Sequence, residues 1–221
     1  METKLSQASI IAIAFDILAE KQDLTKLSMR QLAQKANVQA PALYWYFKNK
    51  QQLLQKMAET MENALVIPDP TLDWQEQIIQ FMENYYDLYT TFPCGAQLEI
   101  HTVPSFPSRL DHLEKMIQVL VQEGFSITQS QQTITALQNL LIGQLMDHQQ
   151  EQQLRQKISD GDHFLADAVT SMKTYVEEQH LSGLKASILS HNQATDDKQL
   201  FLSNVQNYLA GLEKKVLSEG N

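Results

Sequence analysis

Residues 28 to 54 read SMRQLAQKANVQAPALYWYFKNKQQLL, and this stretch decides the fold that we expect at the N-terminal end. Ser28 and Gln31 form a capping-box pattern, which is typical of a helix start. Asn37 tolerates the left-handed backbone of a helix exit, and Pro41 favours the first turn of the next helix. Two short helices joined by such a turn form a helix-turn-helix unit, which places its second helix in the major groove of DNA.

Helical periodicity continues on both sides of this unit. An amphipathic helix is predicted before it, with an inner face of Ala8, Ile11, Ala12, Phe15, Leu18 and Ala19. Asn49, followed by Gln52, begins a fourth helix with the inner stripe Leu53, Leu54, Met57, Met61 and Leu65. The segment 66 to 73, VIPDPTLD, has the composition of a linker, and the 114 residues after Pro107 contain no proline. We find no strand alternation and predict an all-α fold.

The charge distribution has one sign along the motif. From Leu24 to Ala58 there are six cations and no acid, although the chain has a net charge of -9. Residues 1 to 50 carry a net charge of +3, so the remaining residues carry -12. Duplex DNA would be attracted to the N-terminal end and repelled by the rest. Taken alone, an excess of three cations is better explained by a solvated surface.

The residue types of the motif suggest individual roles in DNA binding. Arg30 can reach a guanine edge or a phosphate with its two-pronged guanidinium. Tyr44 and Tyr46 are candidates to donate hydroxyls to phosphates, although half-buried packing is the commoner role of a helical tyrosine. Lys50 lies at a helix N-terminus, which favours anions. Trp45 is included among the DNA-binding residues, where it is interpreted as a wedge packed between helices rather than as a base reader. The residues expected to approach base edges are Gln39, Ala40, Pro41 and Ala42.

Other classes of protein find little support in the sequence. No apolar run approaches the roughly 18 residues that span a bilayer, and the first residues lack the order of a signal peptide. A single cysteine, Cys94, is typical of a reducing compartment. We therefore expect a cytoplasmic protein with no membrane partner. The six histidines are scattered and no Gly-rich phosphate loop, nucleophile elbow, CxxC or HExxH motif is present, so we do not expect an enzyme.

The motif closely resembles the DNA-binding domain of the tetracycline-repressor (TetR) family. The matching signature residues are Leu43, Tyr44, Phe47, Lys50, Leu53 and Leu54. Further on, the positions similar to the regulatory core of the same family are Leu113, Glu114, Gly124, Phe125, Ser126, Ile142, Gly143, Asp147 and Gln149. The likeness covers about the first 65 residues well and is faint beyond Asp162.

The resemblance implies a ligand-responsive transcriptional repressor that binds a palindromic double-stranded operator as a homodimer. It implies a helix-turn-helix domain at 1-50, a connecting helix at 51-65 and a ligand-binding and dimerisation domain at 66-221. Two apolar seams fit a dimer interface or an intramolecular core equally well; they contain Ile134, Leu137, Leu141 and Leu145, and Val205, Tyr208, Leu209, Leu212 and Val216. Gly143 and Gly211 would permit close helix approach.

The effector is expected to be small and largely apolar or aromatic. The candidate ligand-binding residues are Met57, Met61, Leu65, Phe81, Tyr85, Tyr89, His101 and Met116. Leu65, Phe81 and Met116 stand where the family prototype has polar drug contacts. Each candidate has an ordinary core role as its alternative. No cofactor is predicted, and His101 and Asp147 are weak candidates for a divalent metal bound with the effector. The alternative function is a helical DNA-binding protein without a small-molecule ligand, regulated by a protein partner.

Overall fold

A computed structural model describes residues 5–191 and 197–219, and all regular structure within these ranges is helical. The α-helices are α1 (Gln7–Lys21), α2 (Met29–Lys35), α3 (Ala40–Tyr44), α4 (Lys50–Glu62), α5 (Trp74–Thr91), α6 (Gly95–Ile100), α7 (Pro107–Gln122), α8 (Ile127–Ser159), α9 (His163–Glu178), α10 (Ser182–His191) and α11 (Asp197–Glu219). A 3-10 turn, η1 (Leu24–Lys26), separates α1 from α2. Within the described ranges, no helix has both the length and the apolar character needed to cross a membrane.

Local capping chemistry sets the N-terminal helices. Ser28 accepts a hydrogen bond from the backbone N–H of Gln31 and begins α2, as the sequence predicted. Asn37 adopts the left-handed conformation, with φ of 53°, in the turn before α3. Asn49 accepts from the backbone N–H of Gln52 at 2.8 Å and begins α4. The helix-turn-helix prediction is therefore confirmed at its caps and at its turn.

The buried face of α1 differs from the prediction. Ile10, Ala14 and Ile17 are buried with Ile11 and Leu18, whereas Ala8, Ala12 and Ala19 are exposed. The prediction placed the three alanines on the buried face, and this part of the prediction was wrong. The isoleucines bury more apolar area than alanines would, and this burial sets the rotation of the helix. By contrast, the predicted inner stripe from Leu53 to Leu65 is buried at all five positions.

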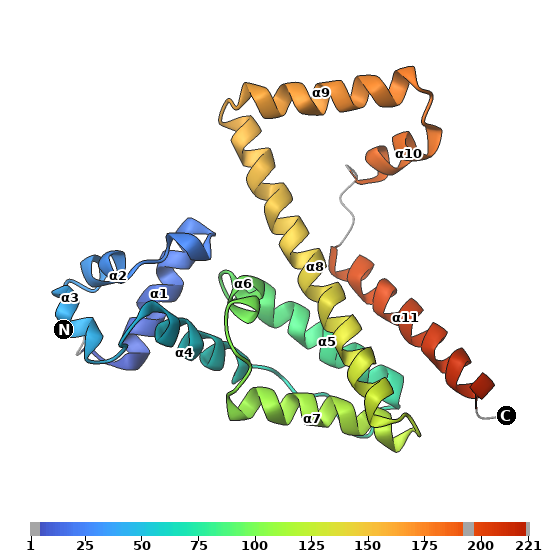
Figure 1. Cartoon of the computed structure of the whole chain (residues 1–221), viewed down its shortest axis with the longest axis horizontal. Helices are drawn as coiled ribbons and strands as arrows, with labels where there is room; N and C mark the ends of the chain where they lie inside the picture. Colours follow the sequence, from blue (N-terminus) through green and yellow to red (C-terminus); the bar gives the residue numbers. More distant parts are fainter. Residues whose placement is uncertain (1–4, 192–196, 220–221) are drawn as a thin grey trace.

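The larger part of the molecule is a helical body with a projecting arm (Figure 1). Helix α5 packs against α7, α8 and α11, and α4 enters this body between α6 and α7. Figure 1 shows the first half of the long α8 beside α5 and α11, whereas its second half extends beyond them to α9 and α10. The segment 66–73 connects α4 to α5 without a helix, as expected of a linker.

The two predicted seams are largely core within this one chain. Leu137, Leu141 and Val205 are at most 1% exposed, and they belong to one cluster that extends from α1 to α11. A Cβ added at Gly143 or Gly211 would meet no atom within 4 Å in the described part of the chain. Neither glycine therefore serves a close helix approach inside the protomer. The side chain of Val216 lies outside the described residues.

Gly95, the first residue of α6, has no room for a side chain. A Cβ at this position would lie 2.5 Å from the carbonyl oxygen of Tyr89 and 2.7 Å from its Cα, and both are backbone atoms. We expect Gly95→Ala to push α6 away from the end of α5 and to lower the free energy of unfolding by about 1 to 3 kcal/mol. Gly143→Ala is the matched control, since its site is open. Chemical denaturation of both variants would test this, and equal losses would contradict the steric argument.

Candidate functional site

The surface of α2 and α3 is exposed at one end of the molecule, away from the helical body (Figure 1). Arg30, Gln39 and Pro41 are exposed, and Tyr44 is 48% exposed. The small residues Ala40 and Ala42 are half-buried beneath them. Six of the predicted DNA-contacting residues thus lie on these two helices and the turn between them. Small residues flanked by longer polar ones suit the close approach of a helix to base edges.

The cations of the motif divide into paired and unpaired groups. Lys35 forms an ion pair with Glu20, and Lys56 forms one with Glu59. Lys26 lies 3.8 Å from Asp23. Among the described residues, no carboxylate lies within ion-pair distance of Arg30 or Lys48, and both side chains are exposed. These two cations are therefore the ones best placed to meet an external anion.

Trp45 is not a wedge between helices. Its side chain is 89% exposed at the C-terminal end of α3, so this prediction was wrong. The core beneath the motif is instead formed by Leu43 and Phe47, which are both fully buried. Together with the neighbouring Tyr44, which is 48% exposed, the indole leaves two adjacent aromatic side chains open to contact with another molecule.

Tyr46 and Lys50 are held inside the domain in this structure. The hydroxyl of Tyr46 donates to the carbonyl of Leu5 at 2.8 Å, and the ammonium of Lys50 donates to the carbonyl of Leu24 at 3.0 Å. Burial lowers the pKa of Lys50, and the nearby Asp23 opposes this effect. Both side chains would have to exchange a protein partner to contact a phosphate.

Helix α4 links the exposed surface to the helical body. Its side chains Gln51 and Gln55 bond to the backbone of the loop that follows α6. Gln51 donates to the carbonyl of His101 at 2.8 Å, and Gln55 bonds with both the N–H and the carbonyl of Val103. A movement of this loop would therefore carry α4 with it.

A second link joins the N-terminal helices to α6 and α8. The side chain of Gln97 accepts from the backbone N–H of Leu24 at 2.8 Å and donates to Gln149 at 3.0 Å. Gln149 and Gln153 in turn donate to the carbonyl of Gln22, where the chain leaves α1 in a left-handed conformation. The orientation of the N-terminal helices is thus tied to the body by amide side chains.

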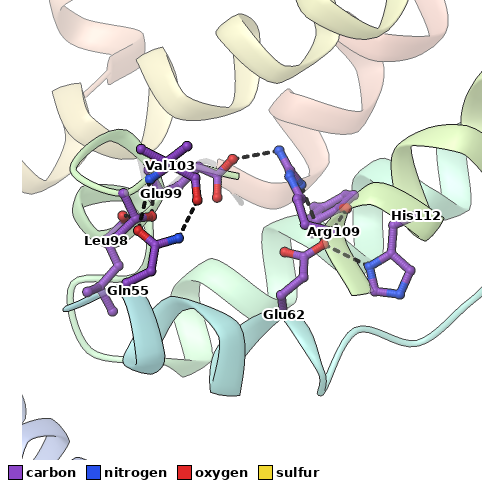
Figure 2. Close-up of polar contacts among 9 residues, drawn as sticks. Gln55, Glu62, Leu98, Glu99, Val103, Arg109 and His112 are labelled. Atoms are coloured by element: carbon purple, nitrogen blue, oxygen red, sulfur yellow. Dashed lines mark hydrogen bonds and ion pairs between the residues drawn. The ribbon is translucent and has the colours of Figure 1, made fainter. Parts of the chain in front are cut away.

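A buried polar cluster lies at the end of α4, where α4 meets α5, α6 and α7 (Figure 2). Glu62 is fully buried and accepts from the Tyr85 hydroxyl at 2.8 Å and from Nδ1 of His112 at 2.7 Å. Arg109, 3% exposed, donates to Glu99 at 2.5 Å and places Nη1 3.5 Å from Glu62. Figure 2 shows Arg109 between these two carboxylates. Side chains from four helices therefore meet in one buried polar cluster.

Burial changes the acidity of this cluster. It raises the pKa of the Glu99 carboxyl, although Arg109 works in the opposite direction. It also raises the pKa of the Tyr85 and Tyr89 hydroxyls, which are therefore uncharged donors. For Arg109, burial alone would lower the pKa, but its tyrosine and carboxylate neighbours raise it above the ordinary value. The guanidinium is thus a permanent positive charge in the core.

The predicted effector residues lie in different surroundings. Tyr85 and Tyr89 line a small cavity of about 10 Å³ beside Arg109. Met57, Met61 and Met116 are fully buried, and Leu65 and Phe81 are buried. His101 is exposed at the end of α6, where its Nδ1 lies 2.9 Å from the carbonyl oxygen of Gln97. The structure therefore brings the two tyrosines together at a cavity and places His101 apart from it.

The weak metal candidates also lie apart from any ligand set. Asp147 is exposed on α8, whereas His101 lies at the end of α6. In the described part of the chain, no group of three or more His, Cys, Asp or Glu side chains is arranged to hold a metal ion.

Four residues of the buried cluster were missed from sequence: Glu62, Glu99, Arg109 and His112. A signal for them exists. Glu62 continues the spacing of four that begins at Leu54 and Ala58, so it falls on the inner face of α4. Arg109 and His112 occupy the inner face of α7 in the same way, ahead of Met116. A charged residue in the register of an apolar stripe indicates a buried polar site.

Comparison with known proteins gives this architecture a family. The family model described as "Bacterial regulatory proteins, tetR family" matches residues 10–57, and "Tetracyclin repressor-like, C-terminal domain" matches residues 67–216. The chain belongs to the TetR family. The sequence resemblance is therefore confirmed, including the C-terminal part where it was faint.

The relatives of this TetR-family chain include curated repressors and solved structures. It is 27% identical over 216 residues to "Tetracycline repressor protein class G" of Vibrio anguillarum, covering 96% of this chain and 95% of the relative. A possible TetR family transcriptional regulator from Streptomyces coelicolor A3(2) is 25% identical, with a TM-score of 0.73 over 95% of this chain and 99% of the other. A TetR structure from Acinetobacter baumannii in complex with minocycline, 24% identical, has a TM-score of 0.68 over 96% and 98%.

Proposed function

We propose that this TetR-family protein is a transcriptional repressor that binds a palindromic DNA operator as a homodimer and is released by a small-molecule effector. The observation that carries the proposal is the exposed surface of α2, α3 and the turn after α3, where Arg30, Trp45 and Lys48 are exposed and neither cation has an ion-pair partner among the described residues. The rest of the molecule is acidic. A cationic and aromatic surface on an acidic body favours one orientation on duplex DNA.

The connection of this surface to the buried cluster supports the regulatory part of the proposal. One helix, α4, begins beside the DNA-binding surface and ends at Glu62. A ligand that favours one arrangement of the cluster would shift α4 and hence the separation of two α3 helices in a dimer. Its effect on DNA affinity is limited by its differential affinity for the two arrangements.

A homodimer accounts for several surfaces of the protomer. Apolar side chains are exposed along α9 and α10, including Phe164 at 81% and Tyr175 at 60%. Two copies related by a two-fold axis would read half-sites about 34 to 36 Å apart. We propose a DNA-binding domain at 1-50, a connecting helix at 51-65 and a ligand-binding and dimerisation domain at 66-221, in a cytoplasmic protein without catalytic activity.

A small-molecule effector is favoured over control by a protein partner. Solved structures of the same fold hold minocycline and actinorhodin, at 24% and 20% identity to this chain. The decisive experiment is selection of bound sequences from random duplexes. We expect one palindrome with half-sites a helical turn apart. Recovery of no palindrome, or binding unaffected by salt, would overturn the DNA-binding proposal.

The salt dependence of operator binding should identify Lys48 as a phosphate contact. Loss of one contact in each half-site of a dimer is expected to make the slope of log K against log salt shallower by about 1.8 in Lys48→Ala. The control is Lys56→Ala, since Lys56 already pairs with Glu59 on α4. Fluorescence anisotropy over a range of salt concentrations measures both slopes. The same slope for both variants would exclude Lys48 from the interface.

A further inference from the structure

Several buried polar atoms around Arg109 have no hydrogen-bond partner within the described chain. They are Nε and Nη1 of Arg109, Nε2 of Gln138 and Oε2 of Glu62. Arg109 itself is 3% exposed, so bulk water does not satisfy its donors. Buried polar atoms without partners cost free energy, and native proteins keep few of them. Their concentration at one place indicates that a further group completes this site.

The cavity beside these atoms is lined by donors that have no acceptor. Its polar lining contains the donors of Arg109 and Gln138 together with Glu99, which already accepts from Arg109. The rest of its lining is largely apolar or aromatic and consists of Tyr85, Tyr89, Leu141 and Ile142. The volume of about 10 Å³ admits roughly one water-sized group. A donor-rich end and an apolar remainder describe a site for an oxygen on an otherwise apolar molecule.

We propose that Arg109 anchors the effector, and that the effector is a ring-sized apolar molecule carrying one carboxylate or an equivalent oxyanion. The proposal rests on the proposed function, in which this protein responds to a small molecule. A guanidinium donates charge-assisted hydrogen bonds to a carboxylate, and Nε of Arg109, together with Nε2 of Gln138, is without an acceptor at this cavity. The ring of Tyr85 lies 5.1 Å from the guanidinium carbon and provides an aromatic wall.

An acid fits this site better than a base. A cationic headgroup in the cavity would lie beside the permanent charge of Arg109 and would leave its donors unsatisfied. Since burial raises the pKa of Glu99, the uncharged form of this carboxyl is the easier one to accommodate beside a bound anion.

Entry of such a molecule changes the contacts of α4. The cavity must widen to hold a ring, and the carboxylate of the effector then competes for the charge of the guanidinium with Glu62, whose Oε1 lies 3.5 Å from Nη1. Glu62 ends α4, and it would keep its bonds to Tyr85 and His112 while losing the guanidinium. Arg109 thus exchanges the carboxylate of Glu62 for that of the effector. This exchange connects effector binding to α4, the helix that leads to the DNA-binding surface.

Ring-matched acids and amines test the headgroup directly. The probes are benzoate and 1-naphthoate, with benzylamine and 1-naphthylmethylamine as their cationic counterparts, applied to the full chain without DNA. We expect at least one acid to raise the melting temperature by about 3 to 6 °C at ten times its Kd, and neither amine to do so. If no acid shifts the melting temperature, or if the amines shift it as much, the proposal is overturned.

Two substitutions should move acid affinity in opposite directions. Arg109→Lys keeps the charge but removes the Nε donor, so affinity is expected to fall at least about tenfold. Glu62→Gln removes the competing charge, so affinity should rise severalfold. Lys115→Gln, an exposed cation on α7, is the control and should change nothing. If the cluster only supports the fold, Arg109→Lys and Glu62→Gln should both lower acid affinity to the same extent or both leave it unchanged. Either result rejects the proposal.

Operator binding is measured separately on the same protein. If the protein binds an acid but no operator sequence is found, Arg109 remains the anchor and the proposed function is rejected. Operator binding without acid binding would retain the proposed function and reject the effector class.

Discussion

Replacing Arg109 with methionine is expected to lower the free energy of unfolding by about 3 to 5 kcal/mol. The guanidinium lies 2.5 Å from Glu99 and 3.5 Å from Glu62 in the core. Without it, two carboxylates would be buried with no guanidinium between them, and the cost of removing them from water would be uncompensated. Urea denaturation followed by circular dichroism, at one fixed protomer concentration, measures the loss.

An exposed arginine pair of similar geometry supplies the control. Arg155 donates to Glu151 at 2.6 Å on α8, with its side chain 58% exposed. Water screens such a pair, so Arg155→Met should cost less than about 1 kcal/mol. A triple variant with Glu62→Gln and Glu99→Gln added to Arg109→Met should recover part of the loss, because the buried charges are gone. Similar losses for Arg109→Met and Arg155→Met would show that burial is not the cause.

The parts of the fold that could be predicted are those set by local chemistry. Ser28, Asn37 and Asn49 act on backbone groups within a few residues, so their effect is visible in the sequence itself. The stripe from Leu53 to Leu65 was equally clear, since large apolar side chains at helical spacing define a buried face.

Contacts between distant parts of the chain could not be predicted in this way. Glu62 and His112 meet across fifty positions, and nothing near either residue identifies the other as its partner. The face of α1 was misplaced because alanine is compatible with both core and surface, so the neighbouring helices decide the rotation. Trp45 was misplaced for a related reason: its burial depends on whether Leu43 and Phe47 leave room.

The adjacent residues Trp45 and Tyr46 are expected to have separate effects on operator affinity and stability. Trp45→Ala should weaken operator binding by about 2 to 4 kcal/mol over two half-sites, roughly 30- to 1,000-fold. The side chain is 89% exposed, so its loss should change the free energy of unfolding by no more than about 0.5 kcal/mol. Anisotropy titration on the selected palindrome and urea denaturation measure the two quantities.

Tyr46→Phe is the matched variant, one position along the chain. It removes the hydroxyl that donates to the carbonyl of Leu5 at 2.8 Å, so stability should fall by about 0.5 to 1.5 kcal/mol while operator affinity stays the same. If Tyr46→Phe weakens operator binding as much as Trp45→Ala does, the Tyr46 hydroxyl leaves Leu5 for a phosphate in the complex. If Trp45→Ala binds the operator normally, the exposed indole is not part of the DNA-binding surface.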